Sequence, residues 1–194
     1  MKQTNTKRCS WVKEEPLCVD YHDKEWGTPV HDDRILFEFL ILEGMQAGLS
    51  WITILKKREN YREVLDDFNP VKIATYNGEK VEELMKNEGI IRNRRKIESV
   101  IKNAQAFLQV QQEYGSFDHY LWQFVDREPI DNQLQDWKEV QTISSQSEKL
   151  SKDLKKRGFS FIGPTICYAY MQAIGMVNDH TLDCFRHDEV QRLS

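Results

Sequence analysis

The chain has 194 residues, with 27 basic and 31 acidic side chains that give a formal net charge of −4. Hydrophobic residues make up 40% and charged residues 30%, a balance that excludes an intrinsically disordered chain and a collagen-like repeat. Glycine and proline make up about 7% of the chain, against roughly 12% in average proteins, which favours long helices over an all-β fold. We expect residues 1–194 to form a single domain, because this length is common for one.

The sequence carries no signal that would direct it into a membrane. No run approaches the roughly 18 consecutive apolar residues of a membrane-spanning helix, and no apolar stretch follows the basic residues at 1–8 as it would in a secretory signal. We therefore expect a cytoplasmic location. In that reducing compartment the four cysteines are expected to be thiols or metal ligands rather than disulfides. They are Cys9, Cys18, Cys167 and Cys184.

The first half of the chain predicts two apolar helices separated by a break. Residues 32–47 are apolar on nearly every side, which is typical of a buried helix. Gly48-Leu49-Ser50 interrupts the pattern, and Ser50 can cap a second helix over residues 51–68. The basic residues 56–58 of that helix are expected to face solvent.

Helical patterns continue through the rest of the chain, and none of the sequence resembles a sheet convincingly. Asn69-Pro70 and Asn77-Gly78 each open a helix by capping chemistry. Further helices are predicted after the turn at 88–92, over 116–125, over about 147–158 and over 164–175. The predicted architecture is all-α, with a helical body over about 30–160.

Two Cys/His pairs at opposite ends of the chain could hold one metal ion. Cys9 and His22 lie near one end, and His180 and Cys184 near the other. Thiolate sulfur and imidazole nitrogen together are the ligands of tetrahedral zinc sites, and the spacing His180-x3-Cys184 would present two ligands from one helical turn. On spacing alone, however, such pairs are more often unrelated. The other three histidines are expected to be exposed: His31, His119 and His187.

Glu43 is a carboxylate on a helix with hardly any polar face. Burying an ionised carboxylate costs several kcal/mol unless something pairs with it, so Glu43 is either a structural residue that meets a cation or a carboxylate that awaits a ligand. Glu38 lies on the same helix, so burial alone does not select Glu43. Aromatic residues of the N-terminal segment and one just after Gly48-Leu49-Ser50 form either core or a flat slot for a planar cation. They are Trp11, Tyr21, Trp26 and Trp51.

A hairpin over residues 79–113 could contact phosphate. Gly89 at its turn would let the backbone approach an anion, and the helix that follows offers free N–H donors. Basic residues at a helix start oppose the helix dipole, so they suit an external anion or, equally, a solvated basic face. The basic residues here are Arg92, Arg94, Arg95 and Lys96, and a further cluster comprises Lys152, Lys155, Lys156 and Arg157.

Five motifs connect these features: CSW at 9–11, YHDKEWG at 21–27, EGMQAGLSW at 43–51, KKRENY at 56–61 and VNDH at 177–180. On these motifs the chain resembles the DNA-3-methyladenine glycosylase I family, from about Cys9 to Cys184. The strings QAGLSW and YHD-x-EWG are long enough to be specific, whereas residues 126–146 contribute little.

The resemblance implies an all-α fold of the helix-hairpin-helix glycosylase superfamily, with the Gly89 hairpin as the DNA anchor. It also implies one structural Zn²⁺ per chain, which would tie the terminal segments 9–27 and 159–187 together. The implied ligands are Cys9, His22, His180 and Cys184.

The resemblance also assigns a base pocket. Glu43 matches the carboxylate that recognises the methylated purine, and is our candidate catalytic residue. Tyr21 and Trp51 match the aromatic walls, and Gly48 and Leu49 match a turn placed against the gap left in the duplex. No residue matches the usual catalytic aspartate of the superfamily.

The implied function is excision of 3-methyladenine from double-stranded DNA that carries an N3-methylated purine. A monomer associated with the nucleoid would flip the base out and hydrolyse its glycosidic bond, leaving an abasic site and free 3-methyladenine. Cys18 departs from the family, which often has a pocket tyrosine there. Two alternatives remain: a lesion sensor that binds without cutting, and a thiol enzyme that uses Cys167 near a helix start.

Overall fold

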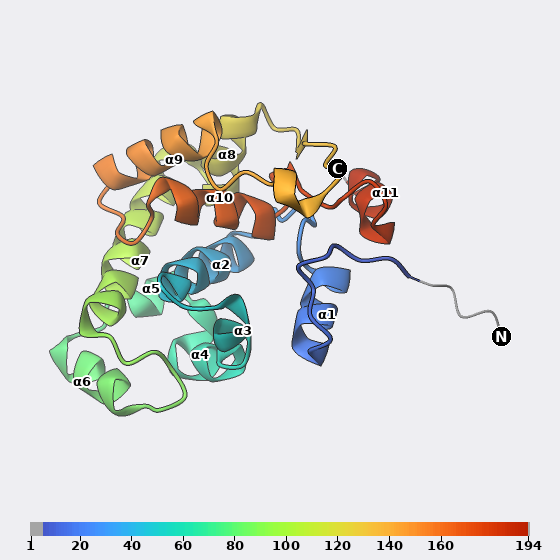
Figure 1. Ribbon diagram of the computed structural model, residues 1–194. Coiled ribbons are helices and arrows are strands. Elements are labelled where there is room, and N and C mark those ends of the chain that lie inside the picture. The colour runs from blue at the N-terminus through green and yellow to red at the C-terminus, as the bar shows by residue number, and fades with distance from the viewer. Residues whose placement is uncertain (1–5, 194) are drawn as a thin grey trace.

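The computed structural model describes residues 6–193, so the ends of the predicted domain 1–194, including the first five residues of the basic N-terminal segment, lie outside it. Helices dominate the described part, which confirms the all-α prediction (Figure 1). Within the described part, no helix is long and apolar enough to span a membrane.

Helix α2 (Asp33–Gln46) lies in the middle of the molecule, as its apolar sequence predicts (Figure 1). The side chain of Asp32 accepts hydrogen bonds from the backbone N–H groups of Arg34 and Ile35, which satisfies two donors that a helix start leaves free. The residues from Leu36 to Met45 are all buried because other helices pack around α2. These neighbours include α3 (Trp51–Leu55), α7 (Arg94–Tyr114) and α10 (Pro164–Ala173).

The prediction of one continuous helix over residues 51–68 is wrong. Helix α3 ends at Leu55, and α4 (Arg58–Val64) and the 3₁₀ helix η1 (Asp66–Phe68) follow as separate elements. The three residues of η1 have φ values between +50° and +53°, a left-handed conformation that cannot continue a right-handed helix. The expectation that Arg58 faces solvent is also wrong, because its side chain is buried against α2 and pairs with Glu38.

The remaining predicted helices are present. Helices α5 (Pro70–Ile73) and α6 (Gly78–Lys86) begin after Asn69 and Asn77, whose side chains cap them. Helix α6 packs against α7, and the two make up the hairpin predicted over residues 79–113. The later helices are α8 (Phe117–Trp122) with its 3₁₀ extension η2 (Gln123–Val125), α9 (Ser145–Lys156) and α10.

Some elements have no counterpart among the predicted ones. They are α1 (Pro16–Lys24), α11 (Phe185–Gln191), the 3₁₀ helix η3 (Trp137–Glu139) and two short strands, β1 (Ile130–Asp131) and β2 (Val177–Asn178). The strands pair in parallel, with Ile130 opposite Val177. Two residues are too few for a visible alternation of polar and apolar side chains. The pairing holds the polar segment 126–146 against the C-terminal part of the chain.

The N-terminal segment lies beside the start of α11, at the right of Figure 1. The backbone N–H of Phe185 donates to the carbonyl of Lys7 at 3.0 Å, and the N–H of Gly27 donates to the carbonyl of Gln172, also at 3.0 Å. These contacts bring the N-terminal segment and α1 against α10 and the start of α11. The functional candidates lie at this junction and on the adjoining end of α2.

Candidate functional site

A cavity of about 220 Å³ opens where α1, α2, α3 and α10 meet. Glu43 and Tyr21 lie in its wall, as the resemblance implies, and Trp51 lies beside them. The other lining residues are Trp11, Trp26, Gln46, Trp137, Ala169 and Gln172. The structure therefore brings together the three residues assigned to base binding.

Glu43 is a buried carboxylate without a partner in the described part of the protein. Its side chain is 4% exposed, and within residues 6–193 it has neither a hydrogen bond nor an ion pair. Among the described residues, the enclosed side-chain nitrogen or oxygen atoms without a partner belong to Trp11, Trp51 and Arg186, so the oxygens of Glu43 must reach open space in the cavity. Burial raises the pKa of Glu43 to about 8, because the charged form loses its hydration.

Aromatic rings surround the cavity at contact distance from one another. The rings of Tyr21 and Trp51 have centroids 5.3 Å apart at an interplanar angle of 50°, and the rings of Trp11 and Trp26 are 5.1 Å apart. Rings at these separations attract each other and hold the walls in place. A planar ligand with a positive charge would be favoured there, because the faces of aromatic rings attract cations.

Trp137 is a wall residue that the sequence analysis missed. It belongs to η3, in the polar segment 126–146, and its ring lies 6.0 Å from that of Trp11 and 5.8 Å from that of Trp26. A single tryptophan in a polar segment is the one signal that could have revealed it. Cys18 is buried on α1 but is not among the residues that line the cavity.

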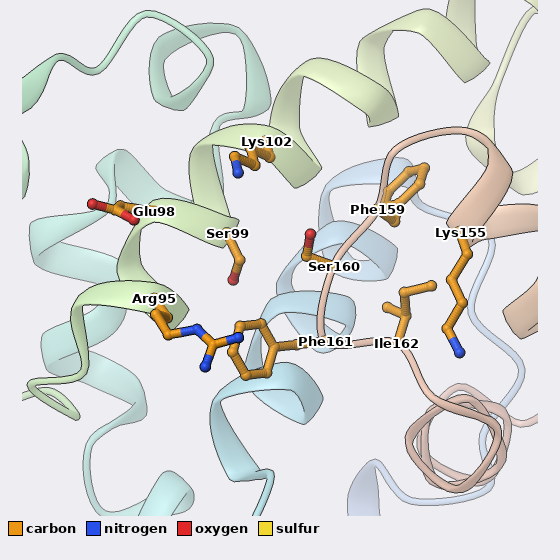
Figure 2. Close-up of a pocket in the computed structure, with 9 residues that line it drawn as sticks. All are labelled: Arg95, Glu98, Ser99, Lys102, Lys155, Phe159, Ser160, Phe161 and Ile162. Atoms are coloured by element: carbon orange, nitrogen blue, oxygen red, sulfur yellow. The ribbon is translucent and has the colours of Figure 1, made fainter.

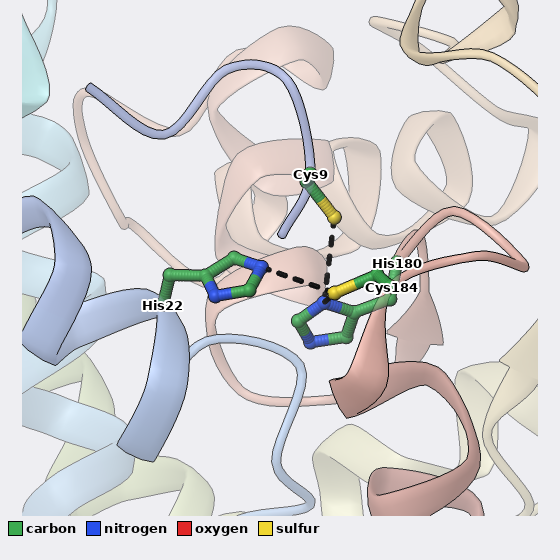
Figure 3. Close-up of side chains that lie close together, drawn as sticks. All are labelled: Cys9, His22, His180 and Cys184. Carbon is green, nitrogen blue, oxygen red and sulfur yellow. Dashed lines mark hydrogen bonds between the residues drawn. The ribbon is translucent and has the colours of Figure 1, made fainter. Parts of the chain in front are cut away.

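Cys9, His22, His180 and Cys184 form a compact cluster (Figure 3). All four residues are buried, and their candidate ligand atoms lie within 4.8 Å of one another. The Sγ of Cys184 lies 3.5 Å from Nε2 of His22 and 3.6 Å from Nδ1 of His180. Zinc bonds of about 2.3 Å to sulfur and about 2.0–2.1 Å to nitrogen, set at tetrahedral angles, place S and N about 3.6 Å apart. The cluster therefore has the atoms and spacing of a tetrahedral metal site.

Neighbouring groups hold both imidazole rings in the orientation that a metal ligand needs. Nδ1 of His22 lies 2.8 Å from Asp23, which is itself held by Arg8, and Nε2 of His180 lies 3.0 Å from the carbonyl of Trp26. In each ring the nitrogen that points away from the cluster is thus occupied, which leaves the other nitrogen for the metal. Burial lowers the pKa of His180, which favours the neutral, metal-binding form.

The two thiols of the cluster have opposite pKa shifts. The hydrogen bond from Cys9 lowers the pKa of the Cys184 thiol, and the same bond raises the pKa of the Cys9 thiol. Cys184 is therefore the thiol that ionises first. A divalent cation would stabilise the second thiolate, since thiolates are the form that binds metals.

Two expectations about histidine and cysteine placement are wrong. His180 and Cys184 are not on one helical turn, because α11 begins only at Phe185; they lie in the turn before it, where the N–H of Cys184 donates to the carbonyl of Thr181. His187 is 4% exposed rather than at the surface, and its Nε2 lies 3.1 Å from Asp131. The expectation for His31 and His119 is confirmed, because both are exposed.

The turn between α2 and α3 carries Gly48 and Leu49 at the surface. Gly48 has φ +80°, and no atom would contact a Cβ there, so it is the backbone conformation that favours glycine. Leu49 is 41% exposed, so its apolar side chain is available to a partner at the surface. The amine of Lys96 donates to the carbonyls of Met45 and Ala47 at 2.8 and 2.7 Å, and so ties the start of α7 to this turn.

The Gly89 turn is built differently from our expectation. A Cβ on this residue would lie 2.4 Å from the side-chain amide of Asn60, so a larger residue would have to displace that side chain. Its N–H donates to Oδ1 of Asn87 at 2.7 Å, and is therefore engaged within the protein rather than free for a phosphate. The role of this turn in the fold is to connect α6 to the basic start of α7.

The three arginines after the turn are exposed. Arg92 lies 3.7 Å from Glu88, and Arg94 lies 2.8 Å from Glu82. Arg95 instead points towards Phe161 in a separate cavity of about 410 Å³ between α7 and the segment before α10 (Figure 2). Cationic groups exceed anionic ones in the lining, which includes Arg95, Glu98, Lys102 and Lys155.

Cys167 lacks the surroundings of a reactive thiol. It is 1% exposed, and its Sγ lies 3.4 Å from the carbonyl of Ile162. Burial raises its pKa to about 12, so the thiolate that a nucleophile requires is not formed at neutral pH. The geometry therefore argues against a thiol enzyme.

Comparison with known proteins identifies the family of this fold and cavity. A family model described as methyladenine glycosylase matches residues 11–187. This chain belongs to the methyladenine glycosylase family. The family's match covers the cavity and most of the metal cluster, and it confirms the resemblance that the motifs indicated.

Individual relatives cover nearly the whole chain. DNA-3-methyladenine glycosylase 1 of Escherichia coli (strain K12) is 52% identical over 178 residues, which are 92% of this chain and 95% of the relative. DNA-3-methyladenine glycosylase of Haemophilus influenzae is 51% identical over 179 residues, which are 92% of this chain and 97% of that protein.

Solved structures of the family have the same fold. A crystal structure of 3-methyladenine DNA glycosylase I superposes with a TM-score of 0.92 at 52% identity, covering 93% of this chain and 100% of that chain. The enzyme from Staphylococcus aureus, described in a study of 3-methyladenine recognition, superposes with a TM-score of 0.90 at 38% identity, covering 93% of this chain and 96% of that one. A variant of 3-methyladenine DNA glycosylase I was solved in complex with 3-methyladenine, with a TM-score of 0.90 at 38% identity over 92% of this chain and 96% of that one.

Proposed function

We propose that this protein is a DNA repair N-glycosylase that excises 3-methyladenine from alkylated double-stranded DNA. The observation that carries the proposal is the Glu43 carboxylate, which is buried, unpaired and open to a cavity walled by aromatic rings. The activity named for the relatives, and the complex of one of them with 3-methyladenine, support the choice of substrate.

The lesion suits this cavity because methylation at N3 gives adenine a positive charge. A flipped-out base would stack against Tyr21 and Trp51, and its charge would meet the carboxylate of Glu43. A nearby cation favours the ionised form of a carboxylate, so the substrate itself would return Glu43 to the charged state. An undamaged adenine brings no charge to offset the burial of that carboxylate, and would bind more weakly.

The positive charge also makes the base a good leaving group. Water attacks C1′ of the sugar and gives one proton to solvent, the bond from C1′ to the base breaks, and the bonding electrons leave with the base as neutral 3-methyladenine. The base needs no prior protonation, so the protein need only extrude the nucleotide and stabilise the charge distribution of the transition state. We assign that electrostatic role to Glu43.

The ion at Cys9, His22, His180 and Cys184 is proposed to be a structural Zn²⁺, one per chain. Four protein ligands leave no coordination position for water or substrate, so the ion would supply stability and no chemistry. It would hold segments 9–27 and 159–187 together beside the base cavity.

We propose that DNA lies across the exposed turn between α2 and α3 and the start of α7. Leu49, next to Gly48, would fill the gap left by the flipped nucleotide, and Arg92, Arg94 and Arg95 would face the phosphates. The Gly89 turn contributes by positioning these arginines, in a helix-hairpin-helix arrangement. A monomer acting at the nucleoid fits this assignment, since one chain supplies every part of it.

The direct test is chromatography of what the protein releases from alkylated duplex DNA. We expect free 3-methyladenine and an abasic site. A stable complex with alkylated DNA and no released base would instead identify a lesion sensor. If the protein neither releases a base nor binds alkylated DNA selectively, the proposal is overturned.

A further inference from the structure

The base cavity contains a second side chain whose polar groups are strictly oriented. Gln172, at the end of α10, lines the cavity together with Glu43. Its Nε2 donates to Oδ2 of Asp179 at 2.7 Å. The main chain of Gln172 has a separate task, because its carbonyl accepts from the N–H of Gly27. The side chain is therefore not needed for that contact.

Asp179 is placed so that it determines which way the Gln172 amide faces. It is 1% exposed, and it also accepts hydrogen bonds from the hydroxyl of Tyr168 at 2.9 Å and from Nδ2 of Asn132 at 2.6 Å. A carboxylate surrounded by three donors can only accept, so the NH₂ group of Gln172 must face Asp179. The carbonyl oxygen Oε1 is then turned away from it.

That oxygen is accessible from the cavity. Within residues 6–193 no hydrogen bond involves Oε1 of Gln172. In the part of the chain that the structure describes, the enclosed side-chain atoms without a partner are nitrogens of Trp11, Trp51 and Arg186, so Oε1 is not enclosed. The cavity thus presents two acceptors, the carboxylate of Glu43 and the amide oxygen of Gln172.

We propose that Gln172 is a specificity-determining residue that accepts a hydrogen bond from the exocyclic amino group of adenine, and that Asp179 positions it. The inference rests on the proposed function and extends it to the choice between purines. The N6 amino group of adenine has two hydrogens and can donate to both acceptors, whereas guanine carries the acceptor O6 at that position. An acceptor facing O6 leaves both oxygens without a hydrogen, which is costly in a buried site.

The test uses Gln172→Met, which keeps the length of the side chain and removes the acceptor. Single-turnover excision of 3-methyladenine and of 3-methylguanine is measured on the same alkylated duplex DNA. We expect 3-methyladenine excision to fall roughly five- to tenfold, as for the loss of one buried hydrogen bond. Excision of 3-methylguanine is expected to stay constant or rise, so the ratio of the two rates falls.

Gln111→Met is the matched control. Nε2 of Gln111 also donates to a carboxylate, Oδ2 of Asp33 at 2.6 Å, but Gln111 does not line the cavity. We expect this variant to keep the wild-type ratio. A similar change in both variants would show that the effect comes from stability, and would overturn the specificity role of Gln172.

Asp179→Asn tests the positioning role separately. An asparagine can donate to Oε1 of Gln172 and let the amide turn over, so its NH₂ group faces the cavity. We expect 3-methyladenine excision to fall several-fold and 3-methylguanine excision to rise, with the fold confirmed by circular dichroism and the metal content by mass spectrometry.

The outcomes separate this inference from the proposed function. An unchanged ratio in Gln172→Met, with wild-type protein active on 3-methyladenine, overturns the inference alone. If Gln172→Met does not fold, the ratio in Asp179→Asn decides in the same way. A wild-type protein that releases no methylated base overturns the proposed function.

Discussion

Glu38 and Glu43 lie on the same buried helix, yet only Glu38 meets a counter-charge. Oε1 of Glu38 lies 2.5 Å from Nε of Arg58 and 2.8 Å from the guanidinium of Arg62. Glu43 is equally buried and has only the cavity in front of it. The first carboxylate therefore stabilises the fold, and the second remains available for a ligand.

Replacing Glu38 with Gln is expected to destabilise the protein by about 1.5–3 kcal/mol, because the buried guanidinium of Arg58 loses a charged hydrogen bond and keeps its ion pair with Glu25. Urea denaturation at pH 7 measures the loss. Glu59→Gln is a suitable control, since Glu59 also pairs with Arg62 but is exposed, and it should cost less than about 1 kcal/mol. Equal effects of the two variants would contradict the structural role of Glu38.

Glu43 should make the protein less stable as pH rises. Its folded pKa, about 8, lies above the ordinary value of 4.5, so between these pH values the folded state keeps a proton that the unfolded state releases. The free energy of unfolding contributed by this group is greatest below pH 4.5 and is lost as pH rises to 8. The loss is on the order of 4–5 kcal/mol at about 1.4 kcal/mol per unit.

Urea denaturation of the wild type and of Glu43→Gln across pH 5–8.5 measures this contribution. As pH rises, the free energy of unfolding of Glu43→Gln should increase relative to that of the wild type. Parallel curves would mean that Glu43 is ionised in the folded state throughout this range.

Glu43→Gln should keep the fold and lose excision. A neutral amide cannot offer the charged hydrogen bond that the cationic base needs, and such bonds contribute about 1.5–3 kcal/mol. We expect the single-turnover rate of 3-methyladenine release to fall roughly 10- to 100-fold. Full activity in a folded variant would show that Glu43 takes no part in the reaction.

Cys184→Ala should remove the metal and lower the stability. Losing a structural ion is among the few single changes that cost on the order of 4–5 kcal/mol. Metal content by mass spectrometry should fall from one zinc per chain to none, and the Tm should fall with it. Cys18→Ala changes a buried cysteine outside the cluster and should retain the ion. Undiminished zinc in Cys184→Ala would reject the ligand assignment.

Replacing Arg94 and Arg95 together by Ala should weaken binding to every duplex sequence. Each lost phosphate contact reduces the slope of log K against log salt by about 0.9, so the double variant should be shallower by about 2. Arg192→Ala is the control, because that arginine follows α11 on the other side of the molecule from α7 (Figure 1). An unaltered slope in the double variant would show that the start of α7 does not face DNA.

Local chemistry made part of this structure predictable. The cap at Asp32 and the apolar run after it defined α2, and Asn69 and Asn77 marked the starts of α5 and α6. The types of the four metal-cluster residues suggested a zinc site. The family motifs then indicated that Cys9 and His22 bind the same ion as His180 and Cys184. Glu43 was singled out from Glu38, on the same apolar helix, by its place in the family motif EGMQAGLSW.

The features that the sequence did not predict depend on contacts between distant segments. The burial of Arg58 follows from the break after Leu55, which the apolar stripe of residues 51–68 conceals. The orientation of Gln172 follows from Asp179, Tyr168 and Asn132, which only the strand pairing brings together. Trp137 reaches the cavity for the same reason. No periodicity along the chain encodes such placements.

The spacing of the four cluster residues along the chain has a consequence for biosynthesis. Cys184 follows Cys9 by 175 positions, so during translation the last sulfur becomes available only after the helices between them have been made. Those helices can therefore begin to pack before any ion is held. Capture of the proposed Zn²⁺ would be a late step, and protein made without zinc would have its terminal segments unjoined.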